Sequence, residues 1–154
     1  MERKTQLHAE EGRQDLHIQR EFNVPLELLF KAYTDADMLS QWMGTKVLKL
    51  ENKKHGSYQF ETIDGKGNVV FKANGAIHEF TENKKIVRTF EMENTSFGVQ
   101  LEVLEFQKLS GKRSKLSIHT IYESNTLRDE HLKMPFAWGI DMAHNRLEEI
   151  VNNL

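Results

Sequence analysis

Among the side chains of this chain, the histidines can take part in the most kinds of chemistry, because a neutral imidazole can bind a metal ion or exchange a proton near pH 7. The chain has seven histidines and no cysteine, which excludes disulfides, thiolate nucleophiles and cysteine-ligated zinc or iron–sulfur sites. The helical spacing of Asp141, His144 and Glu148 could gather three metal ligands. Such a trio on the polar side of an amphipathic helix is more typical of a solvated face, so we predict neither a metal nor a cofactor.

Acid–base chemistry is a second use of these histidines. His119 lies in a predicted strand, and His144 lies beside the apolar stripe of a predicted helix. Either could act as a general acid–base, with Tyr58 or Tyr122 as a hydrogen-bond donor, in an enzyme of the cyclase or hydratase type. Their spacing does not require them to converge, and the chain has no Gly-x-Ser-x-Gly nucleophile motif. We therefore predict no catalytic residues.

Aromatic and methionine side chains are the more informative set, because pockets for small molecules are mostly apolar with a few polar groups. Methionine suits a surface that must adapt to a ligand. The predicted ligand-lining residues are Trp42, Tyr58, Phe60, Phe71, Phe90, His119, Met134, Trp138 and Met142. Two alternatives stay open: these side chains fill the core and leave no cavity, or the stripe formed by Met134, Trp138 and Met142 is an interaction surface.

Composition and charge limit the function classes. With 154 residues, 38% of them hydrophobic, the chain can bury one sizeable core, and we expect a polar arm over residues 1–14 and a single domain over 15–154. The net charge of −2 argues against nucleic-acid binding through bulk positive charge. Because no apolar run has the length of a signal or a membrane span, we predict a cytoplasmic protein without membrane insertion.

Hydrophobic periodicity predicts the elements that position these residues. Residues 15–22 alternate as a half-buried strand, and Pro25, Asp35 and Gly44 supply start, cap and stop signals for two short helices. Further strands are predicted at 47–50, 57–62, 69–80, 86–92, 97–109 and 115–123. The final segment has an apolar stripe at helical spacing, formed by Phe136, Ile140, Ala143, Leu147, Ile150 and Leu154. We therefore predict an α+β fold with an antiparallel sheet of six to seven strands around one long C-terminal helix.

A family resemblance rests on motifs spread along the chain. They are Arg20-x-Phe22-x-x-Pro25-x-Glu27-x-x-Phe30-x-Ala32-x-Thr34-Asp35, Leu39-x-x-Trp42, Gly56-x-Tyr58-x-Phe60, Asp64-x-x-Gly67, Gly75-x-Ile77-x-Glu79 and Ile86-Val87-x-Thr89-Phe90. In this order the motifs resemble the activator-of-heat-shock-ATPase homologue family, within the SRPBCC (START-like, helix-grip) superfamily. The resemblance covers about residues 15–154. The chain departs from the family at Ala36 and Met43, where proline and tryptophan are usual, and Trp138 stands one place early.

The resemblance implies a helix-grip fold and a small hydrophobic or amphipathic ligand between the sheet and the C-terminal helix. Some relatives in the wider superfamily are cyclases, hydrolases or dehydratases. The eukaryotic namesake is a co-chaperone with a separate chaperone-binding domain, for which we see no room here, so we do not expect that activity. We predict a noncatalytic ligand-binding protein. The alternatives are a protein-interaction module, such as a homodimer or a chaperone partner, and a cyclase or hydratase.

Overall fold

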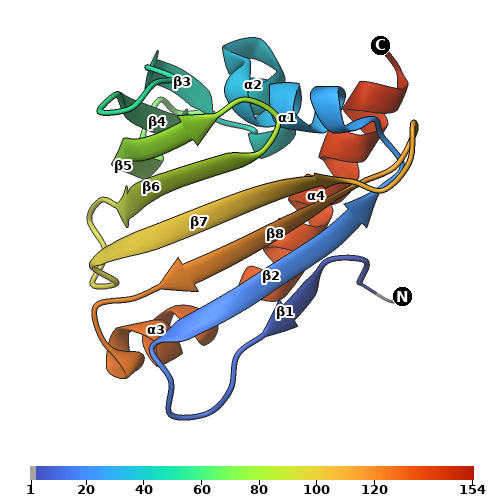
Figure 1. Cartoon of the computed structure of the whole chain (residues 1–154). Coiled ribbons are helices and arrows are strands. Elements are labelled where there is room, and N and C mark those ends of the chain that lie inside the picture. Colours follow the sequence, from blue (N-terminus) through green and yellow to red (C-terminus); the bar gives the residue numbers. More distant parts are fainter. Residues whose placement is uncertain (1–2) are drawn as a thin grey trace.

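The computed structural model describes residues 3–154, which form one antiparallel sheet with four helices (Figure 1). The sheet has eight strands in the order β1-β2-β8-β7-β6-β5-β4-β3. Their bounds are β1 Gln6–His8, β2 Asp15–Phe22, β3 Lys46–Leu50, β4 Ser57–Ile63, β5 Val69–Thr81, β6 Lys85–Met92, β7 Val99–Lys108 and β8 Ser114–Ile121. The predicted α+β class and helix-grip arrangement are confirmed.

The strand count is eight, where six to seven were predicted. The additional strand is β1, which lies within the predicted polar arm and pairs Leu7 with Ile18 of β2. It is only three residues long and mostly exposed, so it has no hydrophobic alternation that sequence reasoning could detect. Its register also places His8 directly opposite His17.

Two short helices follow β2, as predicted. Helix α1 spans Leu26–Thr34 and begins after Pro25, and α2 spans Ala36–Met43. The Asp35 side chain accepts a hydrogen bond from the backbone N–H of Met38 at 3.0 Å, which caps α2. Gly44 ends α2 with a φ of 64°, a left-handed conformation that favours glycine.

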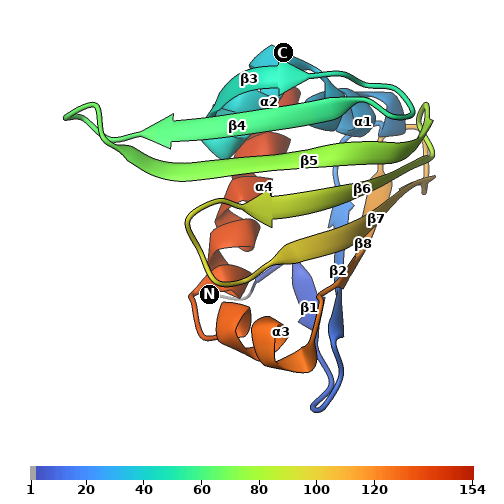
Figure 2. The same cartoon turned by 90° about the vertical axis from the view of Figure 1, so that its left-hand side faces the viewer.

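Two helices complete the chain. Helix α3, Asn125–Leu132, was not predicted, and its buried residues are the polar Arg128 and His131 instead of an apolar stripe. Helix α4, Phe136–Asn152, was predicted, and it crosses the hollow side of the curved sheet (Figure 2). None of the helices within residues 3–154 has the length and hydropathy needed to cross a bilayer.

The core lies between the sheet and helices α1, α2 and α4. Strands β2, β4 and β8 contribute alternate residues, and along β8 these are Ser114, Leu116, Ile118 and Thr120, all buried. We call the surface of the sheet that carries these residues and faces α4 the concave face. The opposite surface is the outer face.

Candidate functional site

The register of β6 and β7 determines which residues share the concave face. Ile86 is opposite Leu104, and both are buried in the core below α1. Two residues further along each strand, Arg88 is opposite Glu102 on the same face. The concave face is therefore apolar near α1 and carries charges further from it.

Arg88 and Glu102 form a partly buried ion pair on this face. The Nε of Arg88 donates to Oε1 of Glu102 at 2.9 Å, and the two side chains are 12% and 16% exposed. The Cζ of Arg88 lies 4.9 Å from the ring centre of Tyr58, close enough for a cation–π contact. Burial alone disfavours the charged guanidinium, but Tyr58 and Glu102 outweigh burial and raise the pKa of Arg88.

Other groups around the ion pair combine hydrogen-bonding capacity with apolar surface. Gln100, opposite Phe90, is buried, and its Nε2 has no hydrogen-bond partner. Phe71, Phe90 and Met92 are partly exposed on the same face. A hollow of about 140 Å³ at the ends of β5 and β6 is lined in part by Phe71 and Met92. Phe71 and Met92 therefore border an unfilled space at this edge of the sheet.

The structure brings four of the predicted ligand-lining residues together on the concave face. Tyr58 and Phe60 are fully buried on β4, with ring centres 5.1 Å apart, while Phe71 of β5 and Phe90 of β6 lie partly exposed. Trp42 is buried among α1, α2 and α4, where its Nε1 donates to the Ala32 carbonyl at 2.7 Å.

The other predicted residues lie elsewhere. Met134, Trp138 and Met142 are 46%, 50% and 57% exposed, so this stripe faces solvent. Arg3 covers part of it, with its Cζ 5.3 Å from the Trp138 ring. His119 lies on the outer face, where its Nε2 is 2.8 Å from Oδ2 of Asp15. These four residues therefore do not share a surface with Phe71 and Phe90.

The prediction that Asp141, His144 and Glu148 form a solvated helix face is wrong. His144 is fully buried, and Asp141 is 4% exposed. The Oδ1 of Asp141 accepts the backbone N–H groups of Lys4 and Thr5 at 2.9 Å, and the buried guanidinium of Arg20 lies 3.5 Å away. The N-terminal segment covers this side of α4, which the sequence pattern could not show.

The groups proposed for acid–base chemistry do not converge. His144 contacts Tyr33 and Thr5, His119 contacts Asp15 on the outer face, and the Tyr58 hydroxyl donates to the Thr89 carbonyl. Tyr122 instead forms a buried hydrogen bond with Nδ1 of His131, a residue that sequence reasoning did not single out. Because His131 lies in the unpredicted helix α3, no sequence signal linked the two.

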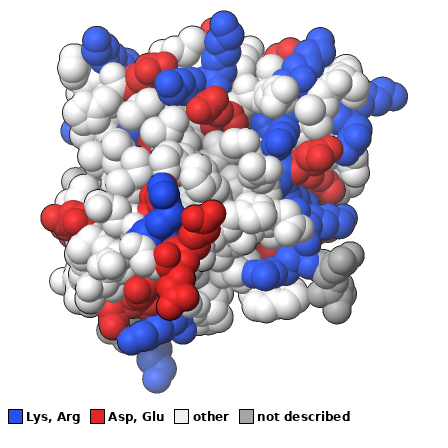
Figure 3. Space-filling model, turned by 60° about the horizontal axis from the view of Figure 1, so that its bottom comes forward, with Lys and Arg blue, Asp and Glu red and all other residues white. Residues whose placement is uncertain are grey.

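A further surface hollow lies outside the predicted site. It has a volume of about 540 Å³ and lies between the start of the described chain, the end of β2 and α4. Its charged lining residues are Arg3, Lys4, Arg20, Arg113 and Lys115 with Glu21 and Glu148. Figure 3 shows Lys and Arg side chains gathered on the right of the lower face of the molecule. The hollow therefore has a local excess of positive charge, despite the nearly neutral chain.

Comparison with known proteins identifies the family. Residues 23–152 match the family described as "Activator of Hsp90 ATPase homolog 1-like protein". The chain belongs to this family. The match covers most of the domain, from the residue after β2 to the last residue of α4.

Solved structures show how widely the fold of this family recurs. A Rhodobacter sphaeroides protein has a TM-score of 0.85 and 18% identity, with 97% of this chain and 100% of that chain covered. A Mycobacterium smegmatis protein has a TM-score of 0.84 and 18% identity, with 96% of each chain covered. A Nitrosomonas europaea protein is 22% identical with a TM-score of 0.76, over 91% of this chain and 95% of that one. None of the curated proteins searched matches the chain. At these identities the comparisons show a shared fold.

Proposed function

We propose that this protein binds a small amphipathic molecule on the concave face of its sheet, beneath α4. The observation that carries the proposal is the ion pair between Arg88 and Glu102 at a position where a filled core would hold apolar side chains. Burying charges costs free energy unless polar partners offset the loss of water. A polar ligand group is such a partner.

The donors on this face favour a ligand with an anionic or carbonyl head group. Of the three guanidinium nitrogens of Arg88, only Nε donates a hydrogen bond to another group within residues 3–154. The two terminal nitrogens are therefore available for a bidentate contact with a ligand. The unpartnered Nε2 of Gln100 is a further donor on this face. Phe71, Phe90 and Met92 would contact the apolar body of the ligand.

The proposal is for a carrier or sensor and not for an enzyme. Catalysis by general acid–base chemistry needs a titrating group within hydrogen-bond reach of the ligand. Both ring nitrogens of His144 already contact Tyr33 and Thr5, and His119 lies on the outer face. On the concave face itself, the carboxylate of Glu102 accepts from Arg88.

The test uses decanoate and decanol, which share a chain length and differ in head-group charge. Saturable binding of decanoate at one site, measured by calorimetry, is the expected result. Arg88→Gln should weaken decanoate binding by at least about tenfold and leave decanol binding nearly unchanged, because a charge-assisted contact contributes about 1.5–3 kcal/mol. Phe90→Ala should weaken the binding of both.

The matched control is Arg113→Gln. Arg113 also pairs with a glutamate, at 2.7 Å, but both partners are exposed. This control should bind decanoate like the unmodified protein, and circular dichroism should show that each variant is folded. The proposal fails if neither decanoate nor decanol binds and native mass spectrometry of protein from its own host shows no bound molecule. It also fails if Arg88→Gln and Arg113→Gln bind decanoate equally well.

A second candidate function is self-association through Met134, Trp138 and Met142. The specific observation is that these three large apolar side chains are exposed on one segment. Light scattering should then show a dimer that Trp138→Glu converts to a monomer. A monomeric unmodified protein at high concentration would exclude this function.

A further inference from the structure

Three histidines form a row across the outer face of the sheet. His8 of β1 is directly opposite His17 of β2, and His17 is directly opposite His119 of β8. Directly opposed residues of antiparallel strands point to the same face, with Cβ atoms about 4.5–5.5 Å apart. The histidines come from both ends of the chain, so only the strand register brings them together.

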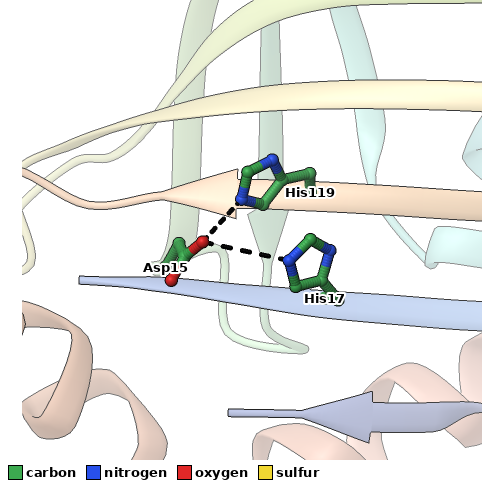
Figure 4. A group of neighbouring side chains, drawn as sticks. All are labelled: Asp15, His17 and His119. Carbon is green, nitrogen blue, oxygen red and sulfur yellow. Dashed lines mark hydrogen bonds and ion pairs between the residues drawn. The ribbon is translucent and has the colours of Figure 1, made fainter. Parts of the chain in front are cut away.

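Asp15 completes a cluster with two of these histidines (Figure 4). Its Oδ2 lies 2.8 Å from Nε2 of His119 and 3.9 Å from Nε2 of His17. The two imidazole rings are stacked, with centres 4.2 Å apart and planes 7° apart. Both Nε2 atoms are therefore on the side of the carboxylate.

We propose that Asp15, His17 and His119 bind a divalent transition-metal ion on the outer face, with His8 as a fourth ligand. Imidazole nitrogen and carboxylate oxygen are the donors that zinc and its first-row neighbours accept together. This site is separate from the proposed ligand site, because the outer and concave faces are opposite sides of the sheet.

The ligand spacing suits such an ion. Zinc bonds of about 2.0–2.1 Å in a tetrahedron place neighbouring ligand atoms about 3.3 Å apart. The two separations from Asp15 lie on either side of this value, and all three ligand atoms are within 4.8 Å of one another. His17 is 52% exposed, so its ring has room to tilt out of the stack toward a shared ion.

The Asp15 carboxylate already has positively charged and hydrogen-bonding partners in a position that solvent can reach. Arg13 and Nε2 of His119 lie 2.7 and 2.8 Å from the oxygens of this carboxylate, and a bound ion would take the place of these partners. A hollow of about 410 Å³ lined by Asp15, His119 and Arg13 gives access to solvent and to water ligands. Arg13 holds both carboxylate oxygens, at 2.7 and 3.0 Å, but its side chain is 58% exposed and can move away.

The test is a Zn²⁺ titration of the untagged full chain against a chromogenic chelator. One equivalent should bind. His17→Gln and His119→Gln should each weaken binding by at least about 10- to 100-fold, the loss that even an outer-shell change commonly causes. His8→Gln should weaken it less, by about tenfold. The control His78→Gln removes an exposed histidine of β5 far from the row and should change nothing.

The substitution Arg13→Gln should change Zn²⁺ affinity in the opposite direction to the histidine substitutions. If Arg13 competes with the ion for Asp15, its removal should strengthen Zn²⁺ binding by about fivefold, the equivalent of one charge at close range in water. Melting curves without metal should show that His119→Gln is folded, since its amide can still donate to Asp15. The proposal is overturned if the unmodified protein binds no Zn²⁺ at one equivalent. It is also overturned if His17→Gln and His119→Gln bind as tightly as His78→Gln.

Discussion

The hydroxyl of Tyr33 lies 3.0 Å from Nε2 of His144, and this contact joins α1 to α4. On the other side of the ring, Nδ1 of His144 is 2.9 Å from the hydroxyl of Thr5. A neutral imidazole has one donor and one acceptor nitrogen, so the two hydroxyls take opposite roles. Burial, and next the positive charge of Arg20, lower the pKa of His144 to about 3. The ring is therefore neutral at physiological pH.

The protein should lose stability in mild acid because of His144. The unfolded chain binds a proton at this residue near pH 6.5, whereas the folded protein does not until about pH 3. The contribution of the neutral ring is complete above pH 6.5. It is then lost by up to about 1.4 kcal/mol per pH unit as the pH falls. Urea unfolding at pH 7 and pH 5 should show this loss.

The substitution His144→Gln tests whether His144 causes this pH dependence of the unfolding free energy. Glutamine does not titrate, yet its amide can still donate to one hydroxyl and accept from the other, so its unfolding free energy should depend less on pH. His131, whose pKa burial also lowers, is present in both proteins and cancels in the comparison. The exposed residue His78 supplies the control, and His78→Gln should keep the original pH dependence. Equal pH dependence in His144→Gln and the unmodified protein would refute the assignment.

Tyr33→Phe should destabilise the protein at neutral pH. The substitution keeps the ring, which packs 4.9 Å from Trp42 and 5.7 Å from Phe106, and leaves Nε2 of His144 without a partner. An unsatisfied buried polar group costs about 1–3 kcal/mol. For a domain of this size that corresponds to a fall in Tm of about 2–4 °C per kcal/mol, measurable by calorimetry. A melting temperature equal to that of the unmodified protein would contradict the prediction.

Arg20→Met should be the more damaging of two arginine substitutions. The Arg20 side chain is fully buried, donates to Asn145 at 2.8 Å and lies between Asp141 and Glu148. Its loss leaves buried carboxylates without their cation, which commonly costs about 3–5 kcal/mol. Arg113→Met breaks an exposed pair with Glu21 and should cost less than about 1 kcal/mol. Urea unfolding of both variants should show this order, and equal losses would contradict it.

Strong periodicity made most of the fold predictable, and its absence explains what was missed. The alternation of Leu16 and Ile18 in β2 predicted that strand, and the stripe through Leu147 predicted α4. Helix α3 buries Arg128 and His131, so its helical face has no apolar signature. The three residues of β1 are stabilised by pairing with β2, and local sequence carries no sign of that partner.

Of the residues in the candidate ligand site on the concave face, only the aromatic ones were predicted from the sequence. Tyr58 and Phe90 were named from their residue type, but Arg88 and Glu102 were not, because charged residues in a strand are expected to face solvent. The strand register shows that Arg88 shares a face with the buried Ile86. The histidine row likewise depends on register, because the pairing of β2 with β1 and with β8 could not be read from local sequence patterns.

A glycine inside a strand often marks a bulge or bend, but the register shift of β5 lies between Ile77 and Glu79. Gly75 keeps its pairing with Tyr58 of β4. A Cβ at this position would overlap the Thr89 carbonyl oxygen and the Tyr58 ring and hydroxyl. The glycine therefore allows Tyr58 to cross β5 and donate to the Thr89 carbonyl.

Gly75→Ala should consequently destabilise the protein by about 1–3 kcal/mol, the usual cost of overpacking. Tyr58 also contacts the guanidinium of Arg88, so displacing its ring should weaken decanoate binding as well. The control is Gly65→Ala in the β4–β5 turn, where an added Cβ meets no atom within 4 Å. That variant should be neutral or slightly more stable, because alanine restricts the unfolded chain. Urea unfolding compares the two, and a Gly75→Ala protein as stable as Gly65→Ala would show that Tyr58 does not need the glycine.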